Sequence, residues 1–225
     1  MDFNTLIFTL IYFFGMALLL VFNEINYRKL KVKGEISRKF AHFVSVLATI
    51  PFPYIFTTHW YILILAIIFG LVLFITRHGT QLKSIHDINR KSIGSYLLPV
   101  SIWATFWISE YFGNKLMYIL PMLILAISDP MAAIVGISLE KYNHRIKIFG
   151  IDTHKSMFGS LAFFISSLTI CLIAFYFNKG SFGLATLIMA VAIAVISTLG
   201  ELLSWRGSDN LTIPLSVIFS LVLFA

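Results

Sequence analysis

The most unusual ionisable residue in this sequence is an aspartate inside a long apolar segment. Asp129 belongs to Ser128-Asp129-Pro130, which lies in the middle of the apolar run 115–139. A carboxylate among apolar side chains is costly, so it usually faces a bundle interior or a wet cavity. Because proline removes a helical N–H donor, we expect the helix to be interrupted at Pro130 and to open onto a cavity there. Asp129 is therefore either part of a functional site or a structural carboxylate paired with a base.

A second candidate is the lysine that precedes the apolar run beginning at residue 157. Lys155 follows Asp152 and Thr153, either of which can cap the coming helix. The free N–H groups of a first helical turn attract anions, and a lysine adds a compact positive charge suited to phosphate. Gly159 allows a backbone to approach closely. This pattern predicts an anion site, although a lysine before a helix is common.

Acidic and basic side chains gather after residue 200. Ser197, Glu201 and Ser204 share one helical face, and Arg206 and Asp209 follow within a few residues. Such a segment is either a solvated turn or part of a site. Carboxylates that can hold a hard cation, together with bases that can hold phosphates, favour a magnesium–nucleotide complex over a bare ion pathway.

A polar stripe also runs along the segment 35–50. Arg38, His42, Ser45 and Thr49 follow one another at helical spacing, so they lie on one face. Arg38 and its neighbour can reach lipid headgroups. His42 lies one turn deeper, where it either forms hydrogen bonds between packed helices or takes a direct part in chemistry.

Composition places these residues in a membrane protein. The 225-residue chain is 59% hydrophobic and only 12% charged, about half of the charged fraction of soluble domains. Such a chain cannot cover a water-facing surface, which excludes soluble, disordered and disulfide-stapled proteins. Its one cysteine, Cys171, can form no internal disulfide.

Eight apolar segments predict an all-α, multi-pass helical bundle that forms one transmembrane catalytic domain over residues 1–225. Fifteen of the 17 Lys and Arg fall on alternate connections, and this bias places both termini outside and the charged motifs in the cytoplasm. Because the bases lie in these loops, the net charge of +7 indicates no nucleic-acid partner. The expected spans are 3–22, 35–50, 57–76, 92–112, 115–139, 157–177, 182–203 and 211–225.

Small residues follow Asp129 at the spacing of one helical turn. Ala132 and Gly136 form a small-xxx-small step on the same apolar segment. Such steps let another backbone pack closely in membranes. We therefore expect a second helix to approach this part of the chain.

Five ordered motifs resemble the CTP-dependent lipid kinases, which comprise phytol kinase, dolichol kinase and the yeast-type diacylglycerol kinase. The resemblance extends from about residue 38 to 214 and is greatest to the phytol kinase branch. The motifs are Arg38-Lys39-x-x-His42, Ile88-x-Arg90-Lys91-Ser92-x-Gly94, Ser128-Asp129-x-x-Ala132-x-x-x-Gly136, Lys155-Ser156-x-x-Gly159-Ser160 and Glu201-x-x-Ser204-x-Arg206-Gly207-x-Asp209-Asn210.

The resemblance implies transfer of the CTP γ-phosphate to the hydroxyl of a membrane-embedded isoprenoid alcohol, with release of CDP. Phytol, geranylgeraniol, farnesol or a polyprenol would be the acceptor. It implies Mg²⁺ as cofactor and CTP as co-substrate, in a multi-pass membrane enzyme; in a bacterium this is the plasma membrane. The catalytic residues would be Asp129, Lys155 and His42; the metal ligands Asp129, Glu201 and Asp209; and the nucleotide- or phosphate-binding residues Arg38, Lys39, Arg90, Lys91, Gly136, Ser156, Gly159, Ser160 and Arg206.

Asp129 has two possible roles in such a reaction, as a Mg²⁺ ligand or as the group that orients and deprotonates the acceptor hydroxyl. The chain departs from the family pattern at Ser128, His154, Phe158 and Trp205, and these changes bear on the choice of lipid and nucleotide. Two rival functions are a phosphatidate cytidylyltransferase that makes CDP-diacylglycerol and an ion-coupled secondary transporter. The sequence leaves the oligomeric state open.

Overall fold

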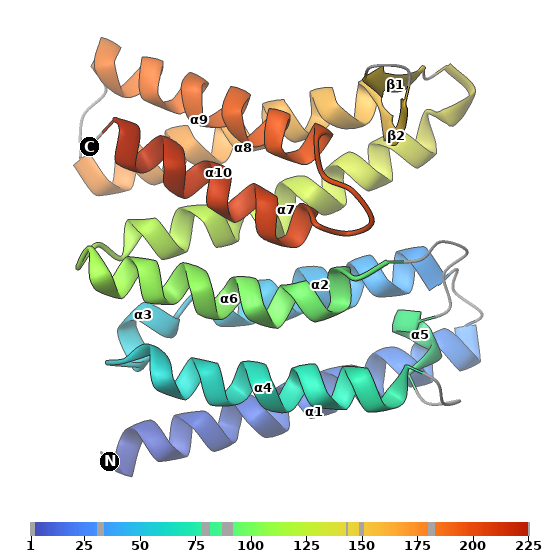
Figure 1. Ribbon diagram of the computed structural model, residues 1–225, viewed down its shortest axis with the longest axis vertical. Helices are drawn as coiled ribbons and strands as arrows, with labels where there is room; N and C mark the ends of the chain where they lie inside the picture. Colours follow the sequence, from blue (N-terminus) through green and yellow to red (C-terminus); the bar gives the residue numbers. More distant parts are fainter. Residues whose placement is uncertain are drawn as a thin grey trace. The chain divides into compact units, whose positions relative to one another are not determined.

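The chain is almost entirely helical wherever its structure is described (Figure 1). The computed structural model describes residues 3–30, 34–77, 82–86, 92–142, 144–148, 151–179 and 183–224. Two compact units divide the chain, Met1–Tyr118 (unit 1) and Ile119–Ala225 (unit 2), and each is described by itself. The predicted all-α class is confirmed, while the single catalytic domain stays a prediction.

Unit 1 packs its helices around a shared apolar interior. Helix α4 lies along α6, and α1 contacts α2, α4 and the short α5. The side-chain oxygen of Thr58 accepts from the backbone N–H of Trp60 and starts α4, where a carboxylate oxygen of Glu110 also accepts from His59 N at 2.7 Å. The helices are α1 (Phe3–Leu30), α2 (Gly34–Thr49), α3 (Phe52–Ile55), α4 (His59–Thr76), α5 (Lys83–His86) and α6 (Gly94–Tyr111).

Unit 2 combines long helices with a small hairpin. Helix α9 packs against both α8 and α10, and strands β1 and β2 pair antiparallel at one end of α8 (Figure 1). Phe163, Ile193 and Ile213 are fully buried in its core. The elements are α7 (Leu116–Ser138, which begins just before the unit boundary), the 3₁₀ turn Glu140–Tyr142, β1 (Arg145–Ile148), β2 (Ile151–Ser156), α8 (Met157–Lys179), α9 (Leu184–Leu202) and α10 (Asp209–Leu223).

All eight expected spans are helices, and five of the described helices are long and apolar enough to cross a membrane, namely α1, α4, α7, α8 and α9. Helices α2 and α10 have only 16 and 15 residues, and α6 includes Ser, Thr and Glu side chains. The passage of these three across the bilayer stays a prediction, as does the orientation of the termini.

Large apolar side chains point outward along the membrane-length helices. Leu18 of α1 is 70% exposed, and Ile75 of α4 and Leu184 of α9 are each 74% exposed. Contiguous apolar surface of this kind is unfavourable in water and favourable against lipid tails. The chain is therefore an integral membrane protein.

Candidate functional site

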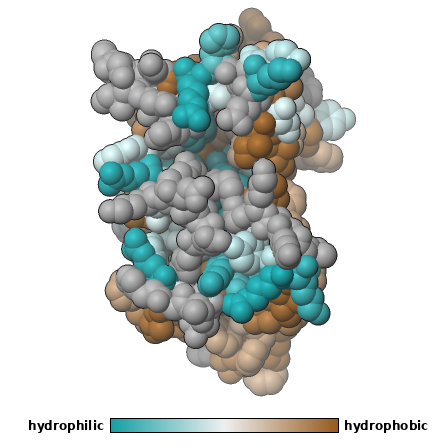
Figure 2. Space-filling view, turned by 90° about the vertical axis from the view of Figure 1, so that its right-hand side faces the viewer, coloured by the Kyte–Doolittle hydropathy of each residue, from teal (hydrophilic) through white to brown (hydrophobic). Residues whose placement is uncertain are grey.

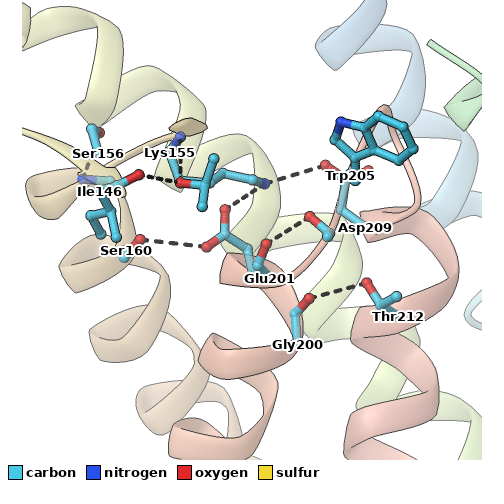
Figure 3. Close-up of polar contacts among 12 residues, drawn as sticks. Ile146, Lys155, Ser156, Ser160, Gly200, Glu201, Trp205, Asp209 and Thr212 are labelled. Atoms are coloured by element: carbon cyan, nitrogen blue, oxygen red, sulfur yellow. Dashed lines mark hydrogen bonds and ion pairs between the residues drawn. The ribbon is translucent and has the colours of Figure 1, made fainter. Parts of the chain in front are cut away.

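The candidate site of unit 2 is centred on Lys155, the penultimate residue of β2. Its Nζ lies 2.6 Å from Oε1 of Glu201 and 3.5 Å from Oδ2 of Asp209 (Figure 3). Oγ of Ser160 donates to the second carboxylate oxygen of Glu201 at 3.5 Å. The structure thus joins residues from β2, α8, α9 and α10, far apart in sequence, in one polar cluster.

This cluster is shielded from the surroundings. The side chain of Lys155 is 17% exposed and that of Glu201 only 3%. Burial by itself lowers the pKa of Lys155, but the negative charges of Asp209, Glu201 and Asp129 outweigh burial and raise its pKa above the usual lysine value. Lys155 is consequently a permanent cation whose partners are carboxylates.

The β-hairpin fixes the backbone on which Lys155 stands. Oγ1 of Thr153 donates to the carbonyl of Ile146 in β1 at 2.7 Å and accepts from the backbone N–H of Lys155 at 3.3 Å. These bonds tie the two strands together next to the lysine (Figure 3). Hydrophilic side chains are visible at this end of unit 2, with hydrophobic ones beside and behind them (Figure 2).

The hairpin was not expected from the sequence, and it moves the helix start. The prediction that Asp152 or Thr153 caps the helix is wrong, because the chain stays extended through Ser156 and α8 begins at Met157. Oγ of Ser156 accepts from the backbone N–H of Gly159 at 3.3 Å, so Ser156 takes the capping position. Alternating residues on both sides of Gly150 were the signal that could have revealed the hairpin.

Two glycines allow α7 and the start of α8 to pack closely. A Cβ on Gly159 would lie 2.8 Å from the carbonyl oxygen of Ala132, and one on Gly136 would lie 2.8 Å from Oγ of Ser156. Neither position has room for a side chain unless its surroundings shift. The predicted close approach at Ala132 and Gly136 is confirmed, and it brings the Lys155 segment against α7.

Asp129 lies on this same helix and is only 3% exposed. Its charge acts on Lys155, so it belongs to the electrostatic surroundings of the cluster. The expected interruption of α7 is wrong, because the helix continues from Leu116 to Ser138 through Pro130. One missing N–H donor leaves the neighbouring helical bonds in place, so the carboxylate is presented by a continuous helix.

Ser128, where the resembled family usually has glycine, has a visible role in packing. Oγ of Ser167 on α8 donates to Oγ of Ser128 at 3.0 Å, and both residues are fully buried. A glycine at 128 could not accept this bond. Ser128, which departs from the family pattern, thus forms a hydrogen bond between α7 and α8.

The connection between α9 and α10 positions the other two carboxylates. Arg206 and Gly207 adopt positive φ angles of 50° and 91°, which reverse the chain between Glu201 and Asp209. Oγ1 of Thr212 donates to the carbonyl of Gly200 at 3.2 Å and joins the two helix ends. The guanidinium of Arg206 lies 4.1 Å from the ring centre of Trp205, and its predicted phosphate contact stays a prediction.

The oxygen donors suit Mg²⁺, although the described side chains do not form a complete metal site by themselves. Within the described ranges, no three His, Cys, Asp or Glu side chains lie close enough together to hold a metal ion. Magnesium is usually bound by one or two carboxylates together with substrate phosphates. Glu201 and Asp209 both contact the ammonium of Lys155, and they could supply the two carboxylate ligands of such a site.

The remaining predicted residues lie in unit 1 or outside the described parts. His42 is buried on α2 at 8% exposure, and Arg38 and Lys39 are half-buried near the start of the same helix. Arg90 and Lys91 lie outside the described residues. The roles of all five in catalysis or phosphate binding stay predictions.

The chain is similar in sequence to two curated proteins. The chain is 29% identical to the phytol kinase of Synechocystis over 134 residues, which cover 60% of this chain and 55% of that protein. The chain is distantly related to phytol kinase. It is also 32% identical over 120 residues to the uncharacterized protein RP860 of Rickettsia prowazekii, covering 53% of this chain and 54% of that one.

These matches have a limited extent. The aligned part spans about half the length of each of the two curated relatives. No protein-family model and no solved structure matches the chain. The relationship to phytol kinase is therefore distant, and the activity of this chain is a proposal.

Proposed function

We propose that this protein is a CTP-dependent kinase that phosphorylates the hydroxyl of a membrane-embedded isoprenoid alcohol. The γ-phosphorus–oxygen bond to CDP breaks, a bond from that phosphorus to the alcohol oxygen forms, and the hydroxyl proton leaves to a base. The products are an isoprenyl monophosphate and CDP. The site faces the cytoplasm in this proposal, as the distribution of Lys and Arg predicts.

The observation that carries the proposal is the buried Lys155–Glu201–Asp209 cluster in a chain related to phytol kinase. Phosphoryl transfer requires little covalent chemistry from the protein and depends on positioning and charge neutralisation. Lys155 supplies an ammonium held by ion pairs with Glu201 and Asp209, and the charge of Asp129 also acts on it. An ion pathway would need no such fixed cation among its carboxylates.

Each residue of the cluster has a definite task in this scheme. Lys155 binds the phosphates of the nucleotide, while Glu201 and Asp209 hold its ammonium in place and contribute oxygen ligands. Mg²⁺ bound by these oxygens would neutralise negative charge on the phosphates. Asp129 either completes that coordination or accepts the proton of the acceptor hydroxyl, and both roles require a carboxylate.

The membrane supplies the acceptor. An isoprenoid alcohol keeps its tail among lipid chains, so its hydroxyl reaches an enzyme from within the bilayer. Three of the apolar helices long enough to cross that bilayer carry candidate residues, with Asp129 on α7, Ser160 on α8 and Glu201 on α9. A phosphatidate cytidylyltransferase would also use a lipid and CTP, but it would release pyrophosphate.

The proposal is tested by purifying the full chain and varying both substrates. The protein is incubated with Mg²⁺, one γ-labelled nucleotide at a time, and phytol, geranylgeraniol, farnesol, diacylglycerol or phosphatidate. We expect label from CTP on the isoprenoid alcohols. Label on diacylglycerol alone would contradict the acceptor, and equal use of ATP would contradict the nucleotide.

A further inference from the structure

Unit 1 contains an apolar cavity that the proposed phosphate chemistry does not use. Its volume is about 100 Å³, and it is partly open. Helices α1, α2, α4 and α6 surround it, and α3 adds Phe52. Like most small-molecule sites, its lining is mostly apolar with a few polar groups.

The dimensions of the cavity fit one hydrocarbon chain. The lining of α4 extends from Ile62 to Leu73, a length of roughly 16 Å at 1.5 Å per helical residue. A partly open cavity of this length suits a segment of a single hydrocarbon chain.

The two ends of the cavity differ in polarity. At one end, the ring of Phe52 meets those of Tyr12 and Phe56 edge-on, with centroids 4.8 and 5.0 Å apart. These rings form an aromatic wall against which a chain can end. Tyr12 and Phe52 both line the cavity.

The other end leads toward cationic side chains. Ser45 lines the cavity from α2, and Arg38 and His42 precede it on the same face of that helix. Leu20 of α1 also lines the cavity. Three residues further along α1, Oδ1 of Asn23 accepts from Oγ of Ser37 at 3.0 Å, so this part of α1 lies beside the start of α2. A hydroxyl or phosphate head would thus lie toward Arg38 and His42.

We propose that this cavity binds the tail of the isoprenoid alcohol, with its hydroxyl end toward Ser45 and His42. The proposal rests on the proposed function for the identity of the chain. Because the bilayer is as apolar as the cavity, hydrophobic transfer alone gives little selectivity. The cavity therefore selects by the fit of the chain along its length and against its aromatic wall.

The site is tested by photolabelling without any nucleotide. The full chain in phosphatidylcholine nanodiscs is irradiated with a diazirine analogue of geranylgeraniol, and labelled peptides are identified by mass spectrometry. We expect label on the cavity-lining residues of α1, α2, α4 and α6, competed by geranylgeraniol but not by diacylglycerol. Equal competition by diacylglycerol, or label only on outward residues such as Ile67, would overturn the proposal.

A matched pair of variants on α4 links the label to the cavity. Ala66 lines it, whereas the adjacent Ile67 is 52% exposed on the outer surface. Ala66→Trp should reduce specific labelling at least about tenfold, equivalent to ~1.4 kcal/mol, and Ile67→Trp should leave it unchanged. Should Ala66→Trp misfold, Ala66→Leu, which removes less space, should shift preference from geranylgeraniol to farnesol. Unchanged labelling and preference in Ala66→Leu would contradict the assignment.

The two proposals can fail separately. Competed labelling of the cavity without phosphate transfer from any nucleotide would overturn the kinase function and leave the tail site standing. Phosphate transfer that Ala66→Trp and Ala66→Leu do not change, in rate or in chain-length preference, would overturn the tail site and leave the kinase function standing.

Discussion

The two units of this protein bury very different interiors. Unit 2 buries Lys155 with Glu201 and Asp209, whose carboxylate oxygens lie within ion-pair distance of its ammonium. Unit 1 contains a partly open cavity whose lining is mostly aliphatic and aromatic. A fixed charge cluster suits phosphate chemistry, and a chain-sized apolar space suits a lipid tail. We therefore expect changes in unit 2 to affect phosphate transfer and changes in the cavity to affect lipid choice.

The largest effect is expected at Asp129. Asp129→Asn keeps the shape but removes the charge, so transfer should fall by about 10²–10⁴-fold, the range of a lost acid–base group. Binding of the geranylgeraniol photoprobe in unit 1 should persist. Turnover and nucleotide affinity are measured together: a fall in Mg²⁺-dependent affinity indicates a metal ligand, and unchanged affinity indicates a base. Near wild-type turnover would make Asp129 a structural acid.

The next effect is expected at Lys155. Lys155→Ala should reduce transfer by about 10²–10³-fold, as for other lost charge-stabilising donors. Lys155→Arg should recover little, because a planar guanidinium does not replace a compact ammonium in a tight space. Lys141→Ala is the control, since that lysine is exposed in the 3₁₀ turn before the hairpin. Normal turnover in Lys155→Ala would remove it from the mechanism.

A smaller effect on stability is expected at the glycine contact that joins α7 and α8. Gly159→Ala forces a Cβ against the carbonyl of Ala132, and overpacking of this kind costs about 1–3 kcal/mol. Gly70→Ala, on α4 of unit 1, meets nothing within 4 Å and serves as control. Thermal unfolding in detergent measures both. Equal unfolding midpoints in the two variants would show that the close approach of α7 and α8 contributes nothing to stability.

The smallest effect concerns the start of α4. Glu110→Gln weakens the bonds to His59 N and Nδ1 and should cost about 1 kcal/mol, as for other helix caps. Tyr111→Phe is the neighbouring control, because that side chain is 80% exposed. Phosphate transfer should not change in either variant. Loss of transfer in Glu110→Gln alone would contradict the division of labour between the units.

The sequence predicted what periodicity and local spacing determine. Apolar runs located eight of the described helices, all except the short α3 and α5, and the Ala132–Gly136 step predicted the close approach that Gly159 completes. The positions of acids and bases along the sequence indicated Lys155, Glu201 and Asp209 as candidate site residues. These signals are local, so a single sequence carries them.

The sequence did not predict features that depend on tertiary contacts. A proline usually weakens a helix, yet α7 continues through Pro130 with a buried Asp129 beside it. The hairpin lacks a clear sequence signal because its strands are short and rich in charges. The apolar cavity also escaped prediction, because helices distant in sequence form it.

The central claim is tested most directly by following both products of one reaction. Purified protein is given Mg²⁺, geranylgeraniol and CTP labelled at either the α- or the γ-phosphate, and lipid and nucleotide products are separated. The account predicts γ-label on the lipid, one CDP for each monophosphate, and loss of both in Lys155→Ala. Lipid carrying the α-label, with pyrophosphate released, or no transfer from any nucleotide to any alcohol, would contradict it.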